Sequence, residues 1–484
     1  MKACKKDKNE LLHQIRMLYA LKYMIKHRKN KKQQIVACHY PRPLKSYKYT
    51  RVTSGYRIYS YSVKKASFIN NPLMPKNLKY LLSTNSSPFC YDKLKHKDYR
   101  SRGYIVIPQN FSIIDNPEES FYTIQKLVYA LFIEDNSFIK LDYQYTNNVE
   151  LSSQVLVDII LKDYLNFVRA LKKQYFTKIP FTESLSGINI NNEDVQKMLF
   201  SVGTPRILGI RNNKFADVEE YPLCVHDNET EKDRIKRMEK KELDTSEMAD
   251  YVINSLKRMN KCLTSEKRDD LCIVIGEILI NAEEHATTNY RYSIGYFKEE
   301  IVGNKHLGIF RLVILNFGKT IYEKFKSEDC PNKDIVKRME ELSEKYTKRE
   351  FFKQSKFDEE TLWTLYALQE GVTSISSKDY KRGNGSIRFI DSFFNIKGSP
   401  DTDSISKMVI ASGNSRIVFD GTYRITTQQK DNQSVYKVMA FNDSGNIEDK
   451  PDTKYVYKES YYFPGTLISA KILLNDDDSV LNNN

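Results

Sequence analysis

Two hydrophobic periods alternate through the middle of the chain. Short apolar or alternating runs, such as "YIVIP" and "SFIKLDY", are typical of β-strands. Longer stretches, such as "SFYTIQKLVYALF", repeat apolar residues every three to four positions, as amphipathic helices do. Strands that alternate with helices predict an α/β unit with a helix-covered sheet over residues 101–225. The expected strands are 104–108 and 137–143, and the expected helices are 120–132, 153–171 and 193–203, the last with Gly203 as its C-cap.

The last 240 residues carry a different pattern. "GEILINAEEHA" (276–286) interleaves carboxylates, an amide and a histidine with apolar residues on one predicted helix. "FRLVILNFGKTI" (310–321) reads as a buried strand that ends in glycine, and "FPGTLISAKILL" (463–474) reads as a late strand. Between them, "GVTSISSKDYKRGNGSIRFIDSFF" (371–394) predicts a glycine-bearing loop that opens onto a helix.

Composition supports several folded parts. At 484 residues with 40% hydrophobic residues, two or three globular domains are expected. The net charge of +14 is uneven, because residues 1–100 hold 24 Lys and Arg against only 4 Asp and Glu. We therefore divide the chain into a basic, tyrosine-rich segment (1–100), the α/β unit (101–225), a charged linker (226–249) and a C-terminal domain (250–484).

Cysteine usage and hydropathy bear on location. The seven cysteines are scattered and include no CxxC pair, which favours reduced thiols over a disulfide framework or a zinc ribbon. The most apolar N-terminal run, "LLHQIRMLYALKYMI" (11–25), is too short and too charged to cross a bilayer. A cytoplasmic protein without a membrane segment is expected.

The helix that carries "GEILINAEEHA" predicts a metal–nucleotide site. Glu277, Asn281 and His285 are spaced i, i+4, i+8 and therefore lie along one stripe. An asparagine offers a neutral oxygen to Mg²⁺ while phosphates complete the coordination shell. A glutamate one turn earlier can orient or deprotonate a nucleophile. A solvated helix face is the alternative interpretation.

The glycine-bearing loop predicts phosphate contacts. Backbone amides freed by Gly383 and Gly385 at a helix start can surround phosphate oxygens, and the helix dipole favours the negative charge. Lys381 and Arg382 would add positive charge.

In this order the motifs resemble the GHKL ATPase family, which includes histidine kinases and anti-sigma serine kinases, over residues 250–475. "EILINAEEHA" looks like its N box, "LNFGKTI" like its first glycine box, "RGNGS" like the second and the Gly-Thr at 465–466 like the last. The resemblance implies a Bergerat fold, an α/β sandwich with a mixed sheet that binds ATP and Mg²⁺ beneath a mobile lid. It implies Glu277 as general base and Asn281 as the Mg²⁺ ligand. The nucleotide-binding residues it implies are Asn281, His285, Asn316, Gly318, Lys381, Arg382, Gly383, Asn384, Gly385, Ser386 and Thr466.

Two positions depart from the family pattern. Asn316 stands where an aspartate normally accepts the adenine amino hydrogen, and a neutral acceptor is weaker than a charged one. A flipped amide would donate instead and relax discrimination against guanine. Ser386 stands where the second glycine box usually has leucine or glycine. Slow turnover, or binding without turnover, is consistent with both departures.

The stretch between the first two glycine boxes is charged and helical in pattern. By position, residues 319–371 correspond to the ATP lid or an insertion in it. Trp363, the single tryptophan, is spaced with three leucines as on a helix packed against a sheet, which indicates a core residue.

Residues 101–225 resemble the STAS domains of bacterial anti-sigma antagonists. In that family a serine follows an acidic position and is phosphorylated. The corresponding positions are Glu150 and Leu151, with Ser152 and Ser153 just beyond. The usual phospho-switch is therefore not expected, and a scaffold or dimerisation module is the alternative.

The class of nucleotide protein follows from what surrounds the motifs. A sensor histidine kinase needs an upstream phosphoacceptor helix, yet only His226 precedes the N box beside an acid, in a stretch that reads as a loop. We expect a regulatory ATPase or serine/threonine kinase of the anti-sigma type, with ATP and Mg²⁺ as cofactors and a protein partner. The alternative is a nucleotide-gated switch with weak catalysis. A homodimer is compatible with either.

The basic segment adds a nucleic-acid hypothesis. Residues 1–65 interleave Lys and Arg with tyrosines, which provides salt-dependent phosphate affinity and rings that stack on unpaired bases. An ordinary strand with exposed tyrosines, or a basic tail that docks an acidic protein, explains the same pattern.

Overall fold

The computed structural model describes thirteen stretches of the chain. They are residues 50–51, 57–58, 68–175, 181–182, 184–210, 213–227, 234–284, 288–302, 305–347, 357–372, 385–397, 406–430 and 434–475. Helices and strands both contribute, and parallel and antiparallel pairs both occur, which confirms the mixed α/β class. Within these stretches, no helix combines the length and the apolar character needed to cross a membrane.

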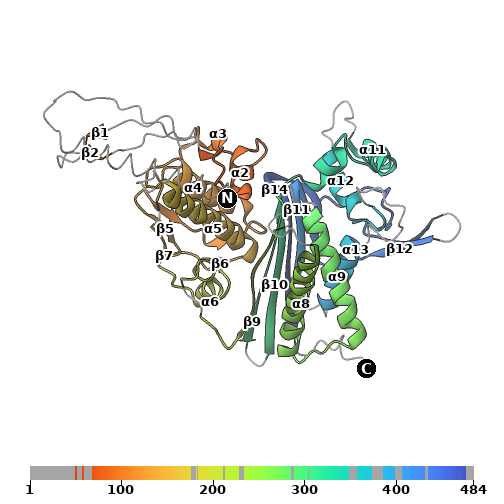
Figure 1. Ribbon diagram of the computed structural model, residues 1–484. Helices are drawn as coiled ribbons and strands as arrows, with labels where there is room; N and C mark the ends of the chain where they lie inside the picture. Colours follow the sequence, from red (N-terminus) through yellow and green to blue (C-terminus); the bar gives the residue numbers. More distant parts are fainter. Residues whose placement is uncertain are drawn as a thin grey trace.

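A five-stranded antiparallel sheet lies at the centre of the molecule (Figure 1). Its strand order is β11-β14-β10-β9-β8, and every neighbouring pair is antiparallel. The mixed sheet expected from the family resemblance is therefore wrong for these strands. β9 and β10 follow each other after two residues, too few for the crossover that a parallel pair requires. The bounds are β8 (Val218–Asp227), β9 (Tyr290–Val302), β10 (Lys305–Phe317), β11 (Lys407–Phe419) and β14 (Val456–Asn475).

Helices cover one face of this sheet (Figure 1). Leu312 and Ile314 of β10 point toward them, whereas Val313 and Leu315 point to the opposite face, as the two-residue period of a strand requires. The helical layer comprises α8 (Arg234–Arg258), α9 (Ser265–Glu284), α10 (Ile321–Lys326), α11 (Lys333–Thr347), α12 (Glu359–Ala367) and α13 (Gly385–Lys397). A hairpin of β12 (Thr426–Lys430) and β13 (Ser434–Val438) extends from this side.

The N-terminal α/β unit covers the other face and shares one hydrophobic core with it. Its strands pair in parallel, in the order β3-β5-β7 and as the pair β4-β6. The predicted alternation of strands and helices is confirmed. The strands are β3 (Tyr104–Val106), β4 (Asn110–Phe111), β5 (Ile139–Asp142), β6 (Asn148–Val149) and β7 (Leu185–Ile188). The helices are α2 (Lys76–Ser83), α3 (Tyr91–Leu94), α4 (Pro117–Phe132), α5 (Leu151–Tyr175), α6 (Glu193–Ser201) and α7 (Thr204–Ile207).

Two predicted boundaries are wrong. Helices α2 and α3 precede residue 101, yet Leu78, Leu81 and Leu94 are buried in the core of the α/β unit, so this unit starts by residue 68. The basic segment is correspondingly shorter. Of residues 1–65, the described part is the strand pair β1 (Thr50–Arg51) and β2 (Arg57–Ile58), so the nucleic-acid hypothesis otherwise lies outside the described residues.

The predicted linker 226–249 is also wrong. Its beginning completes β8, and most of the rest forms α8. Most of the charged residues of α8 whose burial is described are exposed, while Asp244, Met248 and Val252 recur at helical spacing and are buried against the sheet. The many charged residues of α8 obscured this buried stripe in the sequence.

Two further expectations concern single residues. Trp363 is fully buried, which confirms it as a core residue, and its helix α12 buries six of nine residues. This part of the predicted lid (319–371) therefore belongs to the fixed core. Gly203 lies one residue beyond the C-cap, Val202, of α6. Its φ is not left-handed, and the glycine is required because a Cβ would lie 2.9 Å from the Leu199 Cα.

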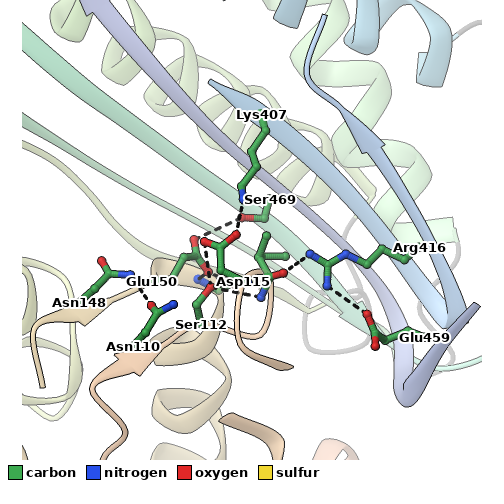
Figure 2. A network of polar contacts seen from close by, with 11 residues as sticks. Asn110, Ser112, Asp115, Asn148, Glu150, Lys407, Arg416, Glu459 and Ser469 are labelled. Atoms are coloured by element: carbon green, nitrogen blue, oxygen red, sulfur yellow. Dashed lines mark hydrogen bonds and ion pairs between the residues drawn. The ribbon is translucent and has the colours of Figure 1, made fainter. Parts of the chain in front are cut away.

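Polar contacts fasten the α/β unit to the sheet (Figure 2). Lys407 of β11 pairs with Asp115, and Arg416 of the same strand donates to the Ile114 carbonyl. Within the sheet, Arg416 also pairs with Glu459 of β14 at 3.2 Å. Because of these contacts and the shared core, the α/β unit packs on one face of the sheet and is not a separate module.

Candidate functional site

Two predicted motifs that are far apart in sequence meet between α9 and α13. α9 carries Glu277 and Asn281 one turn apart, and both side chains are half-buried. Gly385, the first residue of α13, lies directly against them. A Cβ on Gly385 would come within 2.7 Å of Asn281 Nδ2 and 3.2 Å of Glu277 Cβ. The absence of a side chain at Gly385 therefore lets the start of α13 approach the carboxylate and the amide.

Only one of the two carboxylate oxygens of Glu277 has a hydrogen-bond partner among the described residues. Its Oε1 accepts a hydrogen bond from Arg388 Nη1 of α13 at 3.0 Å. Its Oε2 is buried and has no hydrogen-bond partner among the described residues. A buried carboxylate oxygen without a donor is costly, and ligand, water or metal commonly satisfies such an atom.

The start of α13 can attract an anion. The helix is 13 residues long, and the backbone amides of its first turn have no partners within the helix. The resulting partial positive charge lies at the helix start, and Gly385 there is next to Glu277 and Asn281. Ser386 is the second residue of the helix and is half-buried. His285, Lys381, Arg382, Gly383 and Asn384 lie outside the described residues.

Asn316 is used by the protein backbone. The side chain is buried, its Nδ2 donates to the Ala282 carbonyl at 2.6 Å, and its Oδ1 accepts from the Thr466 backbone amide at 3.1 Å. If the amide were flipped, its nitrogen would face the Thr466 N–H and its oxygen would face the Ala282 carbonyl. The orientation is therefore fixed. In this arrangement Asn316 joins α9 to β10 and β14. The arrangement does not present its amide to a base.

Thr466 continues the same polar contacts. Its Oγ1 lies 3.1 Å from Ser412 Oγ on β11. Ser412 also donates to the Gly465 carbonyl at 3.0 Å and accepts from the Ile321 amide at 2.9 Å. Sequence reasoning missed Ser412, because a single serine in a strand carries no signal.

Gly318 and Gly465 lie where the backbones of β10 and β14 come close together. Gly465 has φ +147°, and a Cβ there would overlap the Asn316 carbonyl on β10. Gly318 has φ +148°, donates its amide to the Pro464 carbonyl at 3.2 Å and accepts from the Tyr80 hydroxyl at 2.7 Å. The α/β unit thus touches the end of β10 through Tyr80.

A second polar cluster lies beside the end of α9 and was not predicted. His226 is buried in β8, so the predicted loop there is wrong: a β-bulge between Tyr221 and Cys224 disrupts the strand period. His226 Nδ1 lies 2.9 Å from Asp244 Oδ2, and Nε2 lies 3.8 Å from Glu283 Oε2. A buried imidazole that faces two carboxylates is not placed to accept a phosphoryl group from solvent.

Asp244 is the centre of this cluster. Burial alone would raise its pKa, but the hydrogen bond from His226 and the charge of Arg291 lower the pKa of Asp244 below its ordinary value. Arg291 Nη2 donates to Asp244 Oδ2 at 2.8 Å. Asp244 also accepts from the Cys224 thiol at 3.2 Å, and burial raises the pKa of that thiol to about 11. Cys224 is therefore held as a thiol.

The serines near the acidic position of the α/β unit are also buried. Ser152 hydrogen-bonds to Glu150, and Ser153 accepts from the Ile113 amide at 2.6 Å. Neither serine is exposed to a kinase. Burial raises the pKa of Glu150, which lies 3.4 Å from Ser469 of β14 (Figure 2). These groups belong to the contact with the sheet.

The donor set between α9 and α13 fits a magnesium-bound phosphate better than a metal held by protein alone. Within the described stretches, no three His, Cys, Asp or Glu side chains converge on a metal position. One neutral oxygen from Asn281, one unpartnered carboxylate oxygen from Glu277 and the amides of α13 instead leave most of the coordination to a ligand. Among the described residues, Cys90, Cys224, Cys262, Cys272 and Cys330 form no disulfide with one another.

The chain matches no model of a known protein family, no curated protein and no solved structure.

Proposed function

We propose that this chain is a regulatory protein of the GHKL class that binds ATP and Mg²⁺ and hydrolyses ATP or phosphorylates a protein partner. The observation that carries the proposal is the contact of Gly385 with Glu277 and Asn281. It brings a helix N-terminus, the side-chain amide of Asn281 and a carboxylate close together. Phosphate, divalent metal and an attacking nucleophile need these three groups together.

Each residue has a distinct role in this proposal. Asn281 would coordinate Mg²⁺, which neutralises phosphate charge when bound. The first-turn amides of α13, from Gly385 and Ser386 onward, would hold phosphate oxygens. Glu277 would accept the proton of the attacking water or hydroxyl once Arg388 moves from its carboxylate. Asn316 would support the site by fixing the end of α9 against β10 and β14.

Calorimetric titration with Mg-ATP, Mg-GTP and Mg-ADP, followed by a hydrolysis assay, tests this function. We expect Mg-ATP to bind to the wild type and Asn281→Ala to lose the contribution of Mg²⁺ to affinity. Because the Asn316 amide is fixed and turned to the backbone, we expect little discrimination between ATP and GTP at that position. If injections of Mg-ATP gave the same heat as injections of buffer, the proposal would be contradicted.

The ion pair between Glu277 and Arg388 favours a second candidate, a nucleotide-gated switch that turns over slowly. The basic segment would then contact nucleic acid, and the cytoplasmic partner would be DNA or RNA in addition to a protein or a second copy of the chain. A Glu277→Ala variant separates the two functions, because only an enzyme loses turnover. Deletion of residues 1–65, which leaves the buried helices α2 and α3 intact, tests salt-sensitive retention on nucleic acid.

A further inference from the structure

A row of polar side chains crosses the helix-covered face of the sheet beneath the last turn of α9. Strand register places one residue from each of the five strands directly opposite its neighbour. Four of the five are buried and Thr466 is half-buried. In strand order from β8 to β11 they are His226, Arg291, Asn316, Thr466 and Ser412.

This row lies where β8, β9 and β10 begin or end, beside a row that is apolar on three of the five strands. Two residues along the strands, the same face carries Ile314, Ile468 and Ile410, which pack beneath the helices. Apolar residues could have filled the polar row as well, and burying charges such as Arg291 costs free energy. A buried ion pair is weak evidence for stability, so its presence calls for a positional explanation.

The row lies against two consecutive residues of α9. At its centre, Asn316 donates to the Ala282 carbonyl. At its β8 end, the row reaches Glu283, whose Oε2 lies 3.8 Å from His226 Nε2 and whose Oε1 pairs with Lys241 at 2.7 Å. Both residues immediately follow Asn281 in the helix.

Asp244 joins the β8 end of the row into one unit. Its Oδ2 contacts both His226 and Arg291, which come from adjacent strands. Around it, His226 Nε2, Glu283 Oε2 and Arg291 Nε and Nη1 are buried without hydrogen-bond partners among the described residues. Asp244 therefore holds His226 and Arg291, and Lys241 holds Glu283, although some polar atoms of these side chains have no hydrogen-bond partner among the described residues. A loss of Asp244 would release His226 and Arg291 together.

From this geometry we infer that Asp244 and Arg291 are positioning residues for the magnesium ligand Asn281, acting through the buried row on the last turn of α9. The inference rests on the proposed function, because it assigns these residues to the same nucleotide site. Neither residue touches the site, and the effect passes through His226, Glu283 and the Ala282 carbonyl. Groups that bond a metal ligand directly change metal affinity by roughly 10- to 100-fold, so more distant positioning residues are expected at the lower end of this range.

The test compares nucleotide affinity with and without metal. ATP is titrated calorimetrically into wild type, Asp244→Asn and Glu283→Gln, each in Mg²⁺ and in chelator. The ratio of the two dissociation constants reports the metal ligand separately from the rest of the pocket. Glu459→Gln is the control, because it weakens a largely buried ion pair with Arg416 on the opposite face of the sheet. Hydrogen exchange of the last-turn amides of α9 is measured on the same four proteins.

We expect the metal-dependent ratio to fall about tenfold in Asp244→Asn and Glu283→Gln, with faster exchange at the end of α9, and to stay at the wild-type value in Glu459→Gln. An unchanged ratio in both folded variants would overturn the positioning role and leave the proposed function standing. A wild type that binds no Mg-ATP would overturn the proposed function and the inference with it. Exchange in α9 that matches the wild type would also overturn the inference.

Discussion

Arg388 of α13 and Glu277 of α9 are 111 positions apart in sequence and form an ion pair, with Nη1 and Oε1 separated by 3.0 Å. Both side chains are about one-third exposed. Exposed pairs of this kind stabilise a fold by less than about 1 kcal/mol. The pair is therefore better suited to controlling the Glu277 carboxylate than to holding the two helices together.

The first prediction concerns Glu277. Glu277→Gln keeps the shape of the side chain and removes its basicity, so we expect the ATP turnover number to fall at least about 100-fold. The affinity for Mg-ATP and the free energy of unfolding should change little. Steady-state turnover and calorimetric titration check the two parts, and undiminished turnover would remove Glu277 from the reaction.

The second prediction concerns Gly385. In Gly385→Ala the new Cβ would meet the Asn281 amide at 2.7 Å, and the amide must move aside. We expect weaker Mg-ATP binding, by about tenfold, in a folded protein, because the displaced group is the end of a side chain. Calorimetric titration measures this loss.

Gly276→Ala is the matched control for Gly385→Ala. It adds the same methyl group within α9, where the nearest atom is Thr245 Cγ2 at 3.9 Å. Alanine within a helix is favoured over glycine by about 0.5–1 kcal/mol, so this variant should be slightly more stable and bind normally. Equal binding losses in both variants would show that the Asn281 contact is not the cause.

The third prediction concerns pH. Burial raises the pKa of Asp158 in α5 to about 7, although hydrogen bonds from Thr204 and Gln154 lower it in part. The folded state therefore favours the protonated carboxyl. Its contribution to stability is full below the unfolded-state pKa of 3.8 and is lost as pH rises toward 7.

Asp158→Asn should remove this pH dependence. Asparagine can place its oxygen where Asp158 Oδ1 accepts both hydrogen bonds, and it carries no charge. Relative to wild type, we expect the variant to gain on the order of 3 kcal/mol in free energy of unfolding between pH 4 and pH 8. Urea unfolding across this range measures the gain, and a constant difference between the two proteins would contradict the assigned cause.

The fourth prediction concerns Trp363. Its ring is fully buried, its Nε1 donates to Ser343 Oγ at 3.1 Å, and it meets Tyr322 edge to face. Trp363→Ala should lower the free energy of unfolding by about 3–5 kcal/mol, because it leaves a large cavity and removes the hydrogen bond to Ser343. Urea unfolding followed by far-ultraviolet circular dichroism measures this loss without tryptophan fluorescence. The exposed Tyr145→Ala should change stability by less than about 0.5 kcal/mol.

Local periodicity predicted individual elements well. Apolar residues repeat at helical spacing through α4 and α5, and the buried runs of β10 and β14 are long enough to identify as strands. Each of these signals lies within one segment. The same reasoning failed for α8, because many of its positions are charged and several of its apolar residues are exposed, and for β8, where a bulge breaks the period.

Sequence reasoning reached the candidate site only in part. It selected Glu277, Asn281 and Gly385, which the structure brings together. It selected Asn316 but not its bonds to Ala282 and Thr466, since these depend on which strands become neighbours. Ser412, Asp244 and Arg291 could not be found from sequence, because each gains meaning only from partners on other strands and helices.

The position of β14 has a consequence for how the protein matures. Of the five strands in the central sheet, β14 comes last in sequence, yet it lies between β10 and β11. During synthesis, both neighbours must wait with unpaired edges and uncovered apolar side chains until residues 456–475 have left the ribosome. A nascent chain stalled before this strand would be a substrate for chaperones, and a truncation that removes it should yield aggregates rather than a smaller folded protein.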